Sequence, residues 1–251
     1  MSSSRSSNAL HARELLYRNV RGFFSTQQFE GQQIVELEGS LFPFNMPAHQ
    51  SACFQISKQI HHEPTDRRHC HEFTVLQWSQ LDWTNEQVLS DVDSFLMAIF
   101  SGDFEPERRT FRQAFIQRLG FDPDELSAAD LRQEARRLGL NVSLGEDRLA
   151  WLKLMFIHFI EPTLGIDIPL YLTDLPSQWR RDTANHDDRT INSTVDIYID
   201  GIKVGSVLSV EGNLIVDQQP KSRTMNIVFG LDRLLMIILE TRQIEKVICH
   251  D

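Results

Sequence analysis

Two short histidine-rich segments hold side chains that could bind a metal. Residues 61–63 are His-His-Glu and residues 69–72 are His-Cys-His-Glu. Imidazole, thiolate and carboxylate groups are the usual ligands of zinc and other transition metals. If the segments end paired strands, His69 and His71 lie on one side and His61 or His62 lies opposite. This predicts a metal site at His61, His69 and His71, although the spacing matches no established metal motif. Polar residues lining a pocket would explain the same pattern.

Two strands are expected on either side of these segments. Cys53–Ile60 and Phe73–Trp78 are rich in apolar and β-branched residues, and the polar stretch between them predicts the loop of an antiparallel hairpin. Before them, residues 8–24 place apolar side chains at helical spacing, and the alternation at residues 34–38 is typical of a strand.

The middle of the chain is expected to form a helical block, Thr84–Glu161. Three pairs have the spacing of a capping box, and each begins a helix: Thr84 with Gln87, Thr110 with Gln113, and Ser127 with Asp130. Gly120 is expected to end the second helix. A fourth helix is expected from about Asp147 to Ile160, with His158 in the core.

Strands resume after this block. Asp200-Gly201 is a typical two-residue hairpin turn between residues 194–199 and 202–210. A last strand, Asn226–Phe229, leads through Gly230 into a helix. The order of elements predicts an α+β fold around an antiparallel sheet.

Composition restricts the class of protein. Among 251 residues, 41% are hydrophobic and 24% are charged, as in an ordinary globular protein. The net charge of −10 argues against sequence-independent nucleic-acid binding, which needs Lys and Arg to neutralise phosphates. Three cysteines suit a reducing compartment, and the apolar runs are too short to span a bilayer, so a cytoplasmic protein is expected. Residues 1–7 are expected to form a disordered tail.

Several segments, taken in order, resemble class II aminoacyl-tRNA synthetases. These are Gly230-Leu231-Asp232-Arg233-Leu234, His71–Trp78, Phe111–Phe115, Asp122-Pro123 and Glu161-Pro162. The helical segments are similar to the elongation factor P lysine ligases, a truncated lysyl-tRNA synthetase-like family. The resemblance implies a class II antiparallel sheet flanked by helices, in one catalytic domain at residues 8–251 with a helical insert at 84–161. It also implies the absence of an anticodon-binding domain, which argues against tRNA as a partner, and a homodimer formed through about residues 8–38.

The resemblance also implies a chemistry. In this family, ATP and a lysine-type amino acid form an acyl-adenylate, and the acyl group passes to a protein acceptor. Arginines and magnesium bear the charge of the triphosphate. The residues expected at the site are Arg233 and Glu63 as catalytic residues; Phe73, His69, His61 and Arg233 at nucleotide-binding positions; and Ser177, Gln178 and Lys203 as substrate-binding residues.

Other positions depart from the family pattern. His61 stands where an arginine holds the α-phosphate, and histidine cannot reproduce a bidentate clamp. Lys203 and Val210 replace two metal-binding glutamates, and Asn226 replaces a glycine. We therefore expect a pseudoenzyme or a protein repurposed to bind a small molecule or protein. The alternatives are a divergent ATP-dependent ligase for a lysine-like amino acid, and a metal-dependent function at the histidine cluster.

Overall fold

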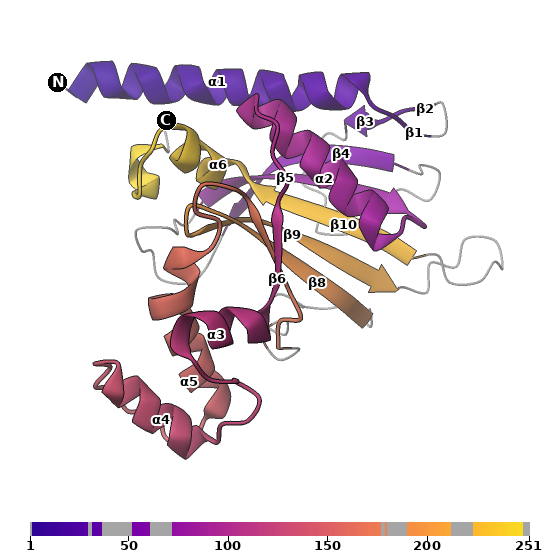
Figure 1. Ribbon diagram of the computed structural model, residues 1–251. Helices are drawn as coiled ribbons and strands as arrows, with labels where there is room; N and C mark the ends of the chain where they lie inside the picture. The colour runs from indigo at the N-terminus through magenta and orange to yellow at the C-terminus, as the bar shows by residue number, and fades with distance from the viewer. Residues whose placement is uncertain are drawn as a thin grey trace. The chain divides into compact units, whose positions relative to one another are not determined.

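The chain folds into two compact α+β units. The computed structural model describes residues 2–29, 32–36, 52–60, 72–176, 179, 190–211 and 223–247 (Figure 1). The larger unit comprises residues 1–105, 188–194 and 204–251, and the smaller unit comprises residues 106–187 and 195–203.

The larger unit contains most of the sheet. Its strands have the order β3-β4-β5-β10-β9, and only the pairing of β3 with β4 is parallel. The strands are β3 (Val35–Glu36), β4 (Ala52–Ile60), β5 (Glu72–Leu81), β10 (Arg223–Gly230) and β9 (Ile202–Glu211, of which Val204 onward belongs to this unit). A separate antiparallel pair is made by β1 (Gln28–Phe29) and β2 (Gln32–Gln33).

One face of this sheet is apolar and carries the core. Phe54, Trp78, Ile227 and Val207 pair in a row across β4, β5, β10 and β9, so their side chains share a face. We call the side with this row the apolar face.

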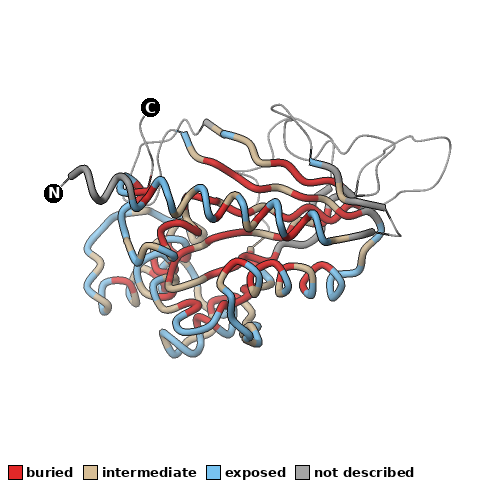
Figure 2. Tube along the Cα trace, turned by 90° about the horizontal axis from the view of Figure 1, so that it is seen from above, coloured by how far each residue is buried: buried red, intermediate tan, exposed pale blue. Residues whose placement is uncertain are grey.

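Two helices, α1 (Ser2–Thr26) and α2 (Asn85–Phe100), pack on the apolar face (Figure 1). The ring of Phe24 on α1 stacks on Phe54 with centroids 4.2 Å apart, and Phe95 on α2 lies 5.2 Å from Trp78. Buried and exposed residues alternate along α1, as its amphipathic sequence requires (Figure 2).

The smaller unit packs short helices around its own core. Its strand order is β8-β7-β6, with β6 (Glu107–Thr110) parallel to β7 (Leu170–Thr173) and β8 (Thr190–Ile199, of which Val195 onward belongs here) antiparallel to β7. The helices are α3 (Phe111–Leu119), α4 (Ala128–Arg137) and α5 (Arg148–Met155), followed by a π-helix at Phe156–Ile160 and a 3-10 turn at Glu161–Thr163. The fully buried side chains of Phe115, Leu131 and Trp151 form the centre of this core.

The local signals in the sequence are confirmed. All three capping boxes form, at Thr84, Thr110 and Ser127. Gly120 ends α3 with a φ of 82°, a left-handed conformation that suits glycine. The two residues of the Asp200-Gly201 turn also have positive φ angles, of 52° and 68°, as a type I′ hairpin turn requires.

Other expectations differ from the structure. The helices of residues 84–161 do not form one block, because α2 belongs to the larger unit and α3 to α5 belong to the smaller one. His158 is exposed on the π-helix, so its assignment to the core was wrong. Helix α1 begins at Ser2, within the segment expected to be a tail. No helix in the described part of the chain is both long enough and apolar enough to cross a membrane.

Candidate ligand-binding site on the polar face of the sheet

The second face of the larger sheet is polar. On a regular strand, side chains alternate between faces, so the residues between those of the apolar face point to the opposite side. The registers of β4, β5, β10 and β9 are uninterrupted, so three rows of paired residues lie on this side, which we call the polar face. The rows are Cys53, Ser79, Asn226 and Leu208; Gln55, Gln77, Val228 and Ser206; and Ser57, Val75 and Gly230. None of these described residues is charged, and most carry a neutral hydrogen-bonding group.

A hydrogen bond links the first row. Ser79 Oγ donates to Asn226 Oδ1 at 2.6 Å, and Asn226 is only 2% exposed. Asn226 Nδ2 is buried and has no hydrogen-bond partner among the described residues. Cys53, also buried, lies at the other end of this row, and burial raises the pKa of its thiol to about 11. The thiol therefore stays protonated at neutral pH.

Phe73 lies on the same face. It pairs with Gln59, and because it lies two residues before Val75 and four before Gln77 on β5, its side chain shares their face. Phe73 is half-buried. An aromatic ring at the edge of a polar surface is well suited to cover a flat ligand group.

Arg233 lies at the junction of the sheet and helix α6 (Leu231–Ile238). The strand β10 ends at Gly230, and the helix begins at the next residue without a side-chain cap. A Cβ atom added at Gly230 would lie 3.5 Å from Arg233 Cδ. The stem of this half-buried arginine therefore packs closely against the strand end.

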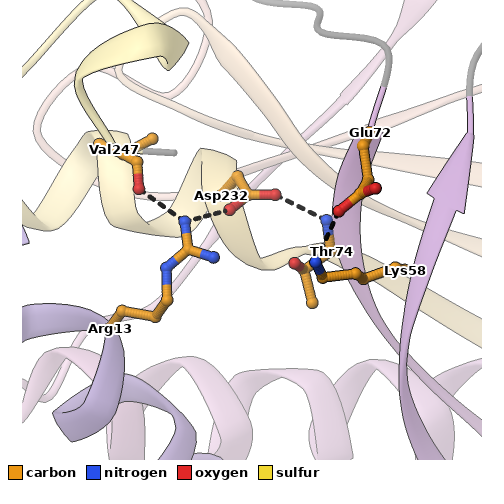
Figure 3. Close-up of polar contacts among 6 residues, drawn as sticks. All are labelled: Arg13, Lys58, Glu72, Thr74, Asp232 and Val247. Carbon is orange, nitrogen blue, oxygen red and sulfur yellow. Dashed lines mark hydrogen bonds and ion pairs between the residues drawn. The ribbon is translucent and has the colours of Figure 1, made fainter. Parts of the chain in front are cut away.

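Beside Arg233, Asp232 is buried in a network that the sequence did not reveal (Figure 3). Its Oδ1 accepts from Arg13 Nη2 at 2.9 Å, and its Oδ2 accepts from the backbone N–H of Thr74 at 2.6 Å. Arg13 Nη2 also donates to the carbonyl oxygen of Val247 at 2.6 Å. Burial raises the pKa of Asp232, and the hydrogen bond from Thr74 and the charge of Arg13 lower it only in part. This network joins α1, β5 and α6.

An ion pair lies where β4 ends and β5 begins. Lys58 Nζ is 2.6 Å from Glu72 Oε1, beside Thr74 (Figure 3). Both side chains are more than half exposed, so the pair contributes little stability.

In the smaller unit, Lys203 pairs with a carboxylate. Its Nζ lies 2.8 Å from Asp196 Oδ2, and the Asp196 side chain is 8% exposed. Lys203 occupies one of the two positions at which the resemblance expects a metal-binding glutamate, and Asp196 balances its charge. Val210, at the other position, pairs with Thr224 in the ladder of the larger sheet.

The other site residues expected from the sequence, Glu63, His61, His69, His71, Ser177 and Gln178, lie outside the described residues. Within the described ranges, no group of three or more His, Cys, Asp or Glu side chains gathers closely enough to hold a metal ion.

A comparison with curated proteins finds relatives that share one name. No family model matches the chain. It is 32% identical over 160 residues to the elongation factor P--(R)-beta-lysine ligase of Vibrio vulnificus, a match that covers 62% of this chain and 49% of the relative. The ligase of the same name from Photobacterium profundum is 26% identical over 226 residues, covering 77% and 70%. For that of Yersinia enterocolitica, the identity is 28% over 164 residues, covering 64% and 50%.

The matched region spans about half the length of the Vibrio and Yersinia relatives. Together with the α+β fold and its mostly antiparallel sheet, these matches show that the chain is a divergent homologue of the elongation factor P--(R)-beta-lysine ligases, which are class II synthetase-like proteins.

Proposed function

We propose that this protein keeps the class II synthetase-like fold but has lost standard magnesium-dependent adenylation, and that its polar face binds a small ligand. The observation that carries the proposal is the ion pair of Lys203 with Asp196. By the resemblance, a glutamate at position 203 would hold a magnesium ion. Here that position provides an ammonium group, and the neighbouring carboxylate is already paired with it.

The charge at this position disfavours a magnesium ion. Magnesium requires oxygen ligands at short distance and near-octahedral geometry. A lysine supplies no such ligand and repels the ion, while the buried carboxylate of Asp196 cannot serve the ion without giving up its ion pair with Lys203. The second expected carboxylate is a valine, Val210.

The replacement of the residues that would contact the phosphates also argues against adenylation. Removing one hydrogen-bond donor that stabilises a transition-state charge costs about 3–4 kcal/mol. Histidine at position 61 cannot replace the paired donors of an arginine, and the metal carboxylates at positions 203 and 210 are absent as well. With these groups replaced, the protein would stabilise the transition state of standard adenylation only weakly.

Calorimetric titration with ATP tests this proposal. We expect the affinity for ATP to be weak or absent and to be the same with and without magnesium, because the metal no longer bridges the protein and the phosphates. Lys203→Glu should restore at most weak magnesium dependence, while Lys153→Glu, a change of the same type on the exposed side of α5, should restore none. Tight, magnesium-dependent ATP binding by the unmodified protein would refute the proposal.

A second candidate is a divergent ligase that activates a lysine-like amino acid for a protein acceptor. It is favoured by Phe73 on the polar face and by Arg233 at the start of α6, the two nucleotide-binding positions that are retained among the described residues. Such a ligase would catalyse exchange of pyrophosphate into ATP that depends on an amino acid, whereas a binding protein would not.

We further propose that two copies of the chain associate through α1. Leu10 and Leu15 on this helix are 48% and 39% exposed, although Leu16 and Val20 are buried in the core. A second copy would cover the exposed leucines. Light scattering should then give a dimer mass for the unmodified protein and a monomer mass for Leu10→Glu with Leu15→Glu.

A further inference from the structure

The strongest unexplained feature of the polar face is the side-chain amide of Asn226. It is nearly fully buried, and one of its polar atoms accepts a hydrogen bond from Ser79. The other, Nδ2, has no partner among the described residues. Whichever way the amide is turned, Ser79 satisfies only one of its two ends. A buried donor without an acceptor destabilises the folded protein, and native proteins keep such groups where a ligand or water completes them.

The hydrogen bond also fixes where the free donor points. Ser79 is directly opposite Asn226 in the ladder of β5 and β10, so the 2.6 Å contact runs across the strands. With Oδ1 held by Ser79, Nδ2 is the end of the amide that is left to donate. The donor is therefore oriented before any ligand arrives, which reduces the entropy cost of binding.

The surroundings of Asn226 determine which acceptor suits it. The three rows of the polar face contain glutamines, serines and apolar residues, and none of these described residues is charged. A carboxylate or phosphate beside Asn226 would lose its hydration without finding a charged partner among the residues of these rows, which is unfavourable. An uncharged oxygen loses much less.

We propose that Asn226 is a specificity-determining residue of the polar face, whose Nδ2 donates a hydrogen bond to an uncharged acceptor oxygen of the ligand. This inference rests on the proposed function and specifies its ligand. Two sources share this chemistry: the carbonyl of an amino-acid amide, and the hydroxyl of a nucleoside.

Two matched pairs of probes distinguish the sources and test the charge preference. L-lysinamide and adenosine have uncharged acceptor oxygens, whereas L-lysine and ATP are their charged counterparts. In calorimetric titrations, at least one uncharged probe should bind about 10-fold more tightly than its charged counterpart. The free energy that corresponds to a 10-fold ratio is small compared with the cost of burying a charge. The pair that shows the difference identifies the source.

Asn226→Ala should weaken binding of the uncharged probe about 5- to 10-fold, the effect of one neutral hydrogen bond, and leave L-lysine, which has no uncharged acceptor oxygen, unaffected. Asn19→Ala, the same change on α1, should alter neither. The inference is overturned if Asn226→Ala leaves the affinity unchanged, if the charged probes bind as tightly, or if none of the four probes binds. In the first of these cases the proposed function still stands, whereas magnesium-dependent ATP binding would remove the proposed function itself.

A second measurement does not require a ligand. If Nδ2 is unsatisfied in the free protein, replacing both partners by apolar groups, Ser79→Ala with Asn226→Leu, should remove a cost of folding. We expect the melting temperature to rise by about 2–4 °C. A fall would show that Nδ2 is already satisfied without a ligand, and would contradict the inference.

Discussion

At the scale of single residues, Asp232 shows how this protein tolerates a buried charge. Its side chain is 3% exposed, and each carboxylate oxygen receives a hydrogen bond, one from Arg13 and one from the backbone of Thr74. Removing one partner of a buried pair leaves the other charge without compensation, and this costs more than the pair itself contributes.

Arg13→Met should therefore lower the free energy of unfolding by about 2–4 kcal/mol at neutral pH. Arg18→Met, on the exposed side of the same helix, should change it by less than about 0.5 kcal/mol. Urea denaturation measures both. Adding Asp232→Asn to Arg13→Met should recover part of the loss, and no recovery would mean that the charge of Asp232 is not the cause.

The effect of pH on this variant has a definite sign. Because burial raises the pKa of Asp232, its contribution to stability is fully present below the ordinary pKa of an aspartate and is lost as pH rises through the raised value. Without Arg13 the pKa rises further. The destabilisation caused by Arg13→Met should hence be larger at pH 7 than at pH 4, and equal losses at both values would contradict the assignment.

At the scale of elements, β9 and β10 approach each other closely at Gly205. A Cβ atom added there would lie 2.8 Å from the carbonyl oxygen of Val228 and 2.9 Å from Cδ1 of Phe229, whose ring packs against Trp78 and Phe95. Gly205→Ala should therefore lower the free energy of unfolding by about 1–3 kcal/mol. Gly22→Ala is the matched control, since nothing lies within 4 Å of its added Cβ. It should be neutral or slightly stabilising, because alanine favours a helix.

Helix α2 contributes a second pH-dependent element. Trp78 Nε1 donates to Asp91 Oδ2 at 2.8 Å, and burial raises the pKa of Asp91 to about 6. The stability associated with its protonated form is present below about pH 4 and is lost as pH rises through 6. Asp91→Asn can still accept from Trp78 but carries no charge. We compare the free energy of unfolding of Asp91→Asn with that of the unmodified protein by urea titration. The difference should shift in favour of the variant by about 1–3 kcal/mol from pH 4 to pH 8. A constant difference would show that Asp91 does not titrate there.

The sequence predicts elements better than it predicts the site. Capping boxes such as Thr84 with Gln87, and the Asp200-Gly201 turn, form from neighbouring residues and can be recognised locally. The contacts of Arg13 with Asp232 and of Ser79 with Asn226 join residues 219 and 147 positions apart. No local pattern marks them, since they depend on the register of the sheet and on the packing of α1. The resemblance singled out Asn226 as a departure, but only the ladder shows that Ser79 orients it.

At the scale of the whole molecule, the homology and the replaced residues give different indications. The relatives are named elongation factor P--(R)-beta-lysine ligases, and the chain has an α+β fold around a mostly antiparallel sheet. The expected metal position, by contrast, holds the Lys203–Asp196 ion pair, and the polar face of the larger unit has no charged residue in its described rows. These two observations are the basis of our proposal that the protein binds a small ligand and no longer carries out standard adenylation.

Exchange of labelled pyrophosphate into ATP tests this central claim most directly. The unmodified protein would be assayed at saturating magnesium with L-lysine, (R)-β-lysine and each of the other common amino acids. The Vibrio vulnificus ligase would serve as the positive control. We predict exchange at the level of the protein-free background for every amino acid. Magnesium-dependent exchange that is stimulated by any one of them would contradict the account and establish a divergent ligase.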